Sequence, residues 1–154
     1  MSLCEVIVST STAQTEQIGA GLALKMTADT SLPRFIALYG DLGVGKTAFV
    51  RGFASVVSPA ALVRSPTFAL VNEYRSPKIP LFHFDMYRID SEDDLISIGF
   101  YDYLERGGIC LVEWSEKIPY ALPDDYLCVT IEKSSSDEPD QRRITIKQIG
   151  EGEG

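Results

Sequence analysis

Long hydrophobic runs, basic residues and paired cysteines are all scarce in this sequence. Its most apolar stretches include residues 35–39 and 109–112, far short of the roughly 20 apolar residues that a membrane-spanning helix needs. No basic residue precedes an apolar stretch at the N-terminus, so we expect no secretory signal. The 3 cysteines do not fall at metal-ligand spacing, and we expect reduced thiols rather than a disulfide framework. These absences favour a cytoplasmic protein.

The shortage of positive charge limits the classes of partner. The chain has 14 Lys and Arg residues against 22 Asp and Glu residues, which gives a formal net charge of −8. A protein that binds nucleic acid by itself usually carries a basic face, because neutralised phosphates supply much of the affinity. We therefore expect any role on nucleic acid to depend on a partner protein, with no membrane involved.

A glycine-rich segment carries the strongest chemical signal. Residues 40–47 read Gly-Asp-Leu-Gly-Val-Gly-Lys-Thr and fit the pattern G-x-x-x-x-G-K-[ST]. The glycines allow a backbone turn whose amides surround an anion at the start of the next helix. Lys46 would then lie between the β and γ phosphates, and the Thr47 hydroxyl would bind Mg²⁺. The pattern predicts a P-loop protein whose cofactors are ATP and Mg²⁺.

The rest of the chain fits one α/β domain around that loop. No repeat or linker divides the sequence, so we expect a single domain over residues 1–150 and a disordered tail at 151–154. The apolar patterns predict strands at residues 4–9, 35–39, 68–74, 81–85, 109–112, 127–131 and 143–149. Helices are expected after a capping box at Ser11, over residues 46–57, after Ser91, and at 101–105. The expected fold is a P-loop NTPase: a single three-layer domain with a mixed, largely parallel central sheet and a C-terminal strand pair.

Two strand ends supply the acidic partner that such a loop needs for Mg²⁺. One apolar strand ends at Asp85 and another at Glu113. Each could instead be a salt-bridged strand terminus. From the residues alone, Asp85 is assigned to the metal, and Glu113 either to the metal or to polarising an attacking water.

Further polar residues cluster near these positions in the sequence. Thr67, within Ser-Pro-Thr-Phe at 65–68, lies where nucleotide hydrolases carry a switch segment, although this tetrapeptide is also an ordinary turn. His83, the only histidine, shares a strand face with Asp85 and could form a network with it and Arg88. Trp114 follows Glu113 directly and could pack beside the nucleotide.

Four motifs together resemble one family. Gly-Asp-Leu-Gly-x-Gly-Lys-Thr, Ser-Pro-Thr-Phe, His-Phe-Asp-x-Tyr-Arg and Val-Glu-Trp occur in the order and at the spacing of the TsaE (YjeE) family, over residues 10–131. This resemblance implies a bacterial ATPase required for threonylcarbamoyl-adenosine formation in tRNA. It further implies that the protein joins TsaB and TsaD, hydrolyses ATP to support their cycle, and does not transfer the group itself.

The resemblance also implies roles for individual residues. Glu113 and Thr67 match the family's essential glutamate and its switch threonine, and with Lys46 they form the expected catalytic set. The expected metal ligands are Thr47, Asp85 and Glu113. The expected nucleotide contacts are Thr12, on the adenine side, and Gly43, Val44, Gly45, Lys46, Thr47 and Ala48. Val44 and Ala48 replace the residues that are usual there, and neither change removes a ligand.

Two other functions use the same kind of loop. A small-molecule kinase would carry an arginine-bearing lid late in the chain, where this sequence has only Arg142 and Arg143 in a cluster. A GTP-specific switch protein would carry N-K-x-D and D-x-x-G motifs, and neither is found. The ATPase is therefore the preferred interpretation, with the kinase as the alternative.

Overall fold

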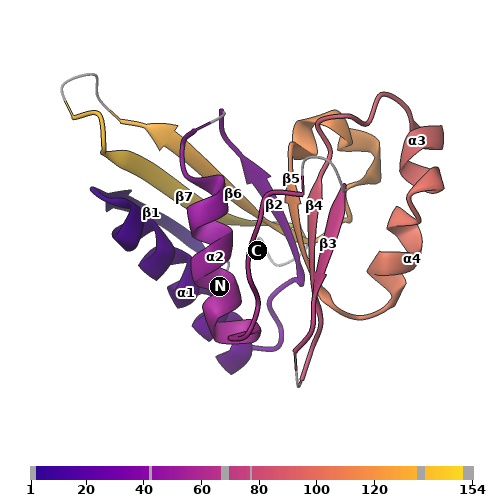
Figure 1. Ribbon diagram of the computed structural model, residues 1–154, viewed down its shortest axis with the longest axis horizontal. Coiled ribbons are helices and arrows are strands. Elements are labelled where there is room, and N and C mark those ends of the chain that lie inside the picture. The colour runs from indigo at the N-terminus through magenta and orange to yellow at the C-terminus, as the bar shows by residue number, and fades with distance from the viewer. Residues whose placement is uncertain (1–2, 42, 67–69, 77, 135–137, 151–154) are drawn as a thin grey trace.

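The chain folds around one sheet. The computed structural model describes residues 3–41, 43–66, 70–76, 78–134 and 138–150. Over these residues a seven-stranded sheet runs in the order β1-β7-β6-β2-β5-β4-β3 (Figure 1). Its strands are β1 (Cys4–Ser9), β2 (Phe35–Tyr39), β3 (Val71–Tyr74), β4 (Leu81–Asp85), β5 (Ile109–Glu113), β6 (Tyr126–Lys133) and β7 (Arg142–Ile149). The helices are α1 (Thr12–Ala28), α2 (Lys46–Val57), α3 (Glu92–Ser97) and α4 (Phe100–Glu105), and the 3₁₀ turns η1 (Ser115–Lys117) and η2 (Pro119–Ala121) follow β5.

The sheet is mixed, as the sequence predicts. Its four central strands, β6, β2, β5 and β4, run parallel to one another. β3 pairs antiparallel with β4, and β7 pairs antiparallel with both β6 and β1. The carboxyl ends of β2, β4 and β5 therefore meet at one edge of the sheet, where ligands bind in open α/β sheets.

Two hydrophobic cores lie on opposite faces of this sheet. Along β2, Ile36 and Leu38 belong to a core that includes Phe49 of α2. Phe35 belongs to the other core, where its ring meets that of Phe100 edge-on with the centroids 6.3 Å apart. A central strand with both faces buried explains why this segment is apolar without alternation. The expected three layers are confirmed.

Helices α1 and α2 cross at two glycines. A Cβ atom at Gly52 would lie 1.8 Å from the carbonyl oxygen of Glu16, and one at Gly19 would lie 2.1 Å from that of Phe49. No side chain fits at either point, so the two backbones pack directly against each other. This contact fixes the position of α2 on the sheet.

The start of α2 differs from the starts of α1 and α3. Ser11 caps α1 by accepting a hydrogen bond from the Gln14 N–H at 3.1 Å, and Ser91 caps α3 by accepting one from the Asp94 N–H at 3.3 Å. The N-cap of α2 is Gly45, with a φ of 112°, and no side chain caps this helix. The first N–H groups of a helix have no partner within it, so at α2 they are available to a ligand.

The structure corrects several predicted boundaries. β3 begins only at Val71, because Leu70 has a left-handed φ of 68° that interrupts an extended strand; residues 68 and 69 lie outside the described chain. β6 and β7 extend further than predicted, to a pair between Lys133 and Arg142, and β5 continues to Glu113. The 3₁₀ turns after β5 were not predicted, since segments this short carry no periodic pattern.

The fold gives no sign of a membrane span. Within the described part of the chain, no helix combines the length and the apolar character that crossing a bilayer requires. The predicted tail, residues 151–154, lies outside the described residues.

Candidate functional site

The loop predicted to bind phosphate connects β2 to α2. At its start, Gly40 has a φ of 147°, and a Cβ atom there would lie 2.6 Å from the carbonyl oxygen of Ile131 on β6. Only glycine fits this close approach. Gly43 and Gly45 also have left-handed φ values, 80° and 112°, whereas Leu42 lies outside the described residues. Beside the loop, a cavity of about 450 Å³ is lined by residues 40, 41, 44 and 131–133.

Lys46 lies inside the protein at the first position of α2. Its side chain is only 6% exposed, and its Nζ donates a hydrogen bond to the Gly40 carbonyl oxygen at 2.7 Å. The same Nζ lies 4.3 Å from the centroid of the Trp114 ring. Among the described residues, no carboxylate forms a salt bridge with Lys46. A buried cation without an acidic partner remains available to an anion.

Asp85 and Glu113 lie side by side at the ends of β4 and β5. They are direct partners in the parallel register, and Glu113 is also opposite Leu38 of β2. Each carboxylate side chain is buried, with 4% of each residue exposed. The Tyr87 N–H donates to Asp85 Oδ1 at 2.9 Å, which orients that carboxylate. The sheet thus brings both predicted acidic residues to the edge where the loop begins.

His83 holds the side chain of Glu113. It is fully buried on β4, and its Nε2 lies 2.5 Å from Glu113 Oε2. The other ring nitrogen, Nδ1, has no hydrogen-bond partner among the described residues, so the contact with Glu113 is what orients the ring. The sequence pattern groups His83 with Asp85 and Arg88, whereas in the structure the hydrogen-bond partner of His83 is Glu113. Arg88 is exposed and lies beyond the strand.

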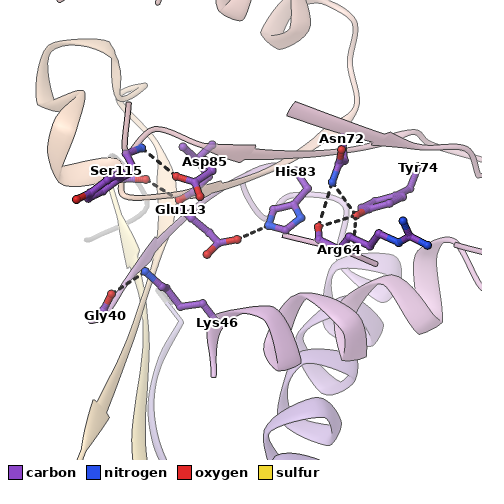
Figure 2. A network of polar contacts seen from close by, with 11 residues as sticks. Gly40, Lys46, Arg64, Asn72, Tyr74, His83, Asp85, Glu113 and Ser115 are labelled. Carbon is purple, nitrogen blue, oxygen red and sulfur yellow. Dashed lines mark hydrogen bonds and ion pairs between the residues drawn. The ribbon is translucent and has the colours of Figure 1, made fainter. Parts of the chain in front are cut away.

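A second set of contacts joins β3 to the segment that precedes Thr67. The Tyr74 ring lies 6.4 Å from that of His83, and its hydroxyl accepts a hydrogen bond from the Arg64 N–H at 3.2 Å. Asn72 Nδ2 donates to the Arg64 carbonyl oxygen at 3.0 Å (Figure 2). The buried His83–Glu113 pair is therefore packed against β3, the strand that holds the backbone of Arg64. Thr67 itself lies outside the described residues.

Backbone strain occurs beside both carboxylates. The non-glycine residues with positive φ, among those described, are Leu70 at 68° and Trp114 at 58°. The Leu70 carbonyl oxygen accepts the N–H of Asp85 at 3.0 Å, and Trp114 follows Glu113 directly. Such conformations cost free energy and gather at functional sites. At Trp114, this turn accompanies the placement of the indole over the Lys46 ammonium.

The remaining predicted contacts surround the start of α2. Thr12 is the first residue of α1 and is exposed. The same first turn of α1 contains Thr15, whose Cγ2 is 3.7 Å from where a Cβ of Gly45 would lie. Val44 and Ala48 are 5% and 7% exposed, so they can offer a ligand little beyond backbone groups. Thr47 is partly exposed next to them.

The side chains near the loop suit a metal ion that takes most of its ligands from water and phosphate rather than from the protein. Within the described residues, no group of three or more His, Cys, Asp and Glu side chains is gathered to hold a metal ion. Mg²⁺ in nucleotide sites usually keeps waters and takes only one or two carboxylates plus phosphate oxygens. Asp85 and the Thr47 hydroxyl supply this small number of protein ligands, so the residues present fit the ion.

Sequence reasoning did not foresee two of these contacts. The ring of Trp114 covers Lys46, where a place beside the nucleotide was expected; its position directly after Glu113 was the available signal. The hydrogen bonds of Tyr74 and Asn72 to the backbone of Arg64 could not be predicted from the sequence, because no sequence pattern shows that these residues meet.

Comparison with known proteins supports the resemblance seen in the sequence. The model of one protein family, described as threonylcarbamoyl adenosine biosynthesis protein TsaE, matches residues 9–144. The chain belongs to the TsaE family. The match includes the loop, both carboxylates and strands β2 to β6, whereas it takes in only the last residue of β1 and the start of β7.

Individual TsaE proteins match over most of their length. The chain is 39% identical over 127 residues to the tRNA threonylcarbamoyladenosine biosynthesis protein TsaE of Bacillus subtilis, covering 82% of this chain and 77% of that protein. The TsaE of Haemophilus influenzae is 37% identical over 113 residues, 73% of this chain and 70% of that protein. A crystal structure of Bacillus subtilis YdiB superposes with a TM-score of 0.76 at 29% identity, covering 97% of this chain and 88% of that one.

Proposed function

We propose that this TsaE-family chain binds Mg²⁺-ATP and hydrolyses it to support threonylcarbamoyladenosine formation in tRNA. One observation carries the proposal. Lys46, a buried cation without a carboxylate partner among the described residues, lies at the uncapped start of a helix, and two buried carboxylates end the neighbouring strands. A polyphosphate with a divalent cation is the ligand whose charges complement this arrangement.

The loop and α2 supply the phosphate contacts. The uncapped N–H groups at the start of α2 can bind an anion, and the helix dipole favours negative charge there. Lys46 Nζ donates one of its three N–H groups to the Gly40 carbonyl oxygen, which leaves two donors for a phosphate. The Trp114 ring beside it limits the access of water to the ammonium.

Asp85 and Thr47 are the proposed protein ligands of Mg²⁺. The ion would neutralise charge on the β and γ phosphates and orient them. The Tyr87 N–H fixes one oxygen of Asp85, which orients this carboxylate at the edge where the loop begins. Thr47 brings its hydroxyl from the first turn of α2.

Glu113 is the proposed residue for the attacking water. A carboxylate that accepts a water proton must keep a fixed direction, and the His83 Nε2 contact provides it. Lys46 contributes to the same chemistry by stabilising negative charge on the transferred phosphoryl oxygens. Contact of Glu113 with the metal is the other open assignment. Thr67 remains the proposed switch residue, and Thr12 the proposed contact on the adenine side.

The proposed partners are TsaB and TsaD. The formal charge of −8 disfavours direct contact with tRNA, so we expect contact with tRNA to run through the partner proteins. A single small domain leaves the γ-phosphate side open to water, which screens the charges that favour reaction. We therefore expect slow hydrolysis alone and faster hydrolysis when TsaB and TsaD close that side.

Steady-state hydrolysis tests this function. ATP turnover is measured for the chain alone and with TsaB and TsaD, and tRNA binding is measured in parallel by gel shift at low salt. We expect partner-stimulated turnover and no tRNA shift for the chain alone. Full turnover without partners, or tight tRNA binding by the isolated chain, would show the partner-dependent account to be wrong.

A further inference from the structure

An arginine from the far end of the chain contacts the phosphate loop. Arg142, the first residue of β7, donates from its Nε to the carbonyl oxygen of Val44 at 3.0 Å. Its Nη1 donates to the carbonyl oxygens of Pro139 at 2.6 Å and Gln141 at 3.0 Å. The partly buried guanidinium thus ties the loop to the turn between β6 and β7, across 98 residues of sequence.

The contact on Val44 determines where the next amide points. A trans peptide bond directs its C=O and its N–H to opposite sides, and the described chain has no cis peptide. Holding the Val44 oxygen toward β7 therefore turns the Gly45 N–H away from β7. Because Gly45 has no side chain and a φ of 112°, this peptide could otherwise rotate with little steric resistance.

We propose that Arg142 is a positioning residue of the phosphate loop, which fixes the Val44–Gly45 peptide so that the Gly45 N–H faces a bound phosphate. The proposal rests on the proposed nucleotide site and names a residue that sets its shape. Arg142 holds three backbone carbonyl oxygens from two nitrogens of one guanidinium, a fixed fork of donors that a lysine ammonium does not reproduce.

The neighbouring arginine provides a matched control. Arg143 carries the same charge one residue later, so β7 directs it to the opposite face of the sheet. It is exposed, and its contact is with Glu132 at 3.5 Å. Removing Arg143 changes the net charge by the same unit without touching the loop.

The test compares ADP affinity, measured by calorimetry, among the parent and the variants Arg142→Ala, Arg142→Lys and Arg143→Ala. Loss of a charge-assisted contact that preorganises the loop should raise the Kd of Arg142→Ala about tenfold, while Arg143→Ala stays within about twofold. Arg142→Lys should resemble Arg142→Ala, since the proposed role is geometric. The KM for ATP should rise more than kcat falls, because bound phosphates hold the loop at saturation.

Each outcome decides the matter. Full ADP affinity in Arg142→Ala, or equal weakening in Arg143→Ala, overturns the proposal. Full restoration in Arg142→Lys also overturns it, because charge alone would then suffice. If Arg142→Ala fails to fold, the ADP affinity of Arg142→Lys decides instead, and its melting temperature without nucleotide shows whether that variant is folded. A parent chain that does not bind ADP would instead refute the nucleotide site itself.

Discussion

Lys46, Asp85 and Glu113 are exposed by only 6%, 4% and 4%, although charged side chains are rarely buried without compensation. Glu113 is compensated by His83, and Lys46 by a carbonyl oxygen and an aromatic ring. Within the part of the chain that the structure describes, no carboxylate forms an ion pair with Lys46. At the residue scale, we therefore expect the buried charge of Lys46 to serve a ligand.

Substitution of the two carboxylates should have different effects on hydrolysis and on Mg²⁺ dependence. Glu113→Gln can keep the hydrogen bond to His83 but cannot take a proton from water, so kcat should fall about a hundredfold or more while ATP affinity changes little. Asp85→Asn should mainly raise the Mg²⁺ concentration needed for tight ATP binding. Calorimetry at several Mg²⁺ concentrations and steady-state kinetics measure both effects.

Glu116→Gln, a change at an exposed residue of η1, is the control and should match the parent. If the Glu113 and Asp85 variants lose folding stability and ATP affinity to the same degree, the proposed division of roles is wrong.

At the residue scale, the sequence predicts candidate residues where the pattern is local. The glycine-rich loop is contiguous, and Asp85 and Glu113 each follow an apolar strand, so the sequence alone identifies them as candidates. Their adjacency needs the strand order β2-β5-β4. The hold of Arg142 on Val44 could not be predicted, because it depends on how far β7 extends toward the loop.

At the scale of elements, α2 is placed by core side chains such as Phe49 and also by direct backbone contact with α1. Its bounds and those of β1, β2 and β4 match the sequence prediction, since capping residues, apolar runs and the loop mark them clearly. The crossing of α1 and α2 at Gly19 and Gly52 was not predicted. A glycine within a helix shows no periodic pattern that would reveal a partner backbone.

Gly52→Ala tests the crossing. The new Cβ would lie 1.8 Å from the Glu16 carbonyl oxygen, so α2 must shift, at a cost of about 1–3 kcal/mol in the free energy of unfolding, as in other overpacked sites. Because α2 carries the loop, ATP affinity should fall as well. Chemical denaturation and calorimetry measure the two effects.

Gly21→Ala is the matched control within α1, because nothing lies within 4 Å of its Cβ position. It should be neutral or stabilising by about 0.5–1 kcal/mol, since alanine favours a helix. Equal stability of the Gly52 and Gly21 variants would contradict direct backbone packing.

At the scale of the whole molecule, a mixed sheet gathers groups from distant parts of the sequence at one edge. The loop after β2, the ends of β4 and β5, and the start of β7 all meet there. The acidic charge of the chain and the buried Lys46 at this edge bear on different ligands. We expect the first to disfavour direct contact with tRNA, and the second to favour a phosphate ligand.

The most direct test of this account is a thermal-shift titration of the parent and Lys46→Ala with ATP, ADP and GTP, with and without Mg²⁺. At a nucleotide concentration of 100 Kd, the parent should gain about 2.7 kcal/mol, which corresponds to a rise in Tm of about 5–10 °C for a chain of this size. Lys147→Ala, at an exposed site on β7, should show the same rise. Lys46→Ala should stay folded and show no rise with Mg²⁺-ATP. An equal rise in Lys46→Ala, or none in the parent, would contradict the nucleotide site.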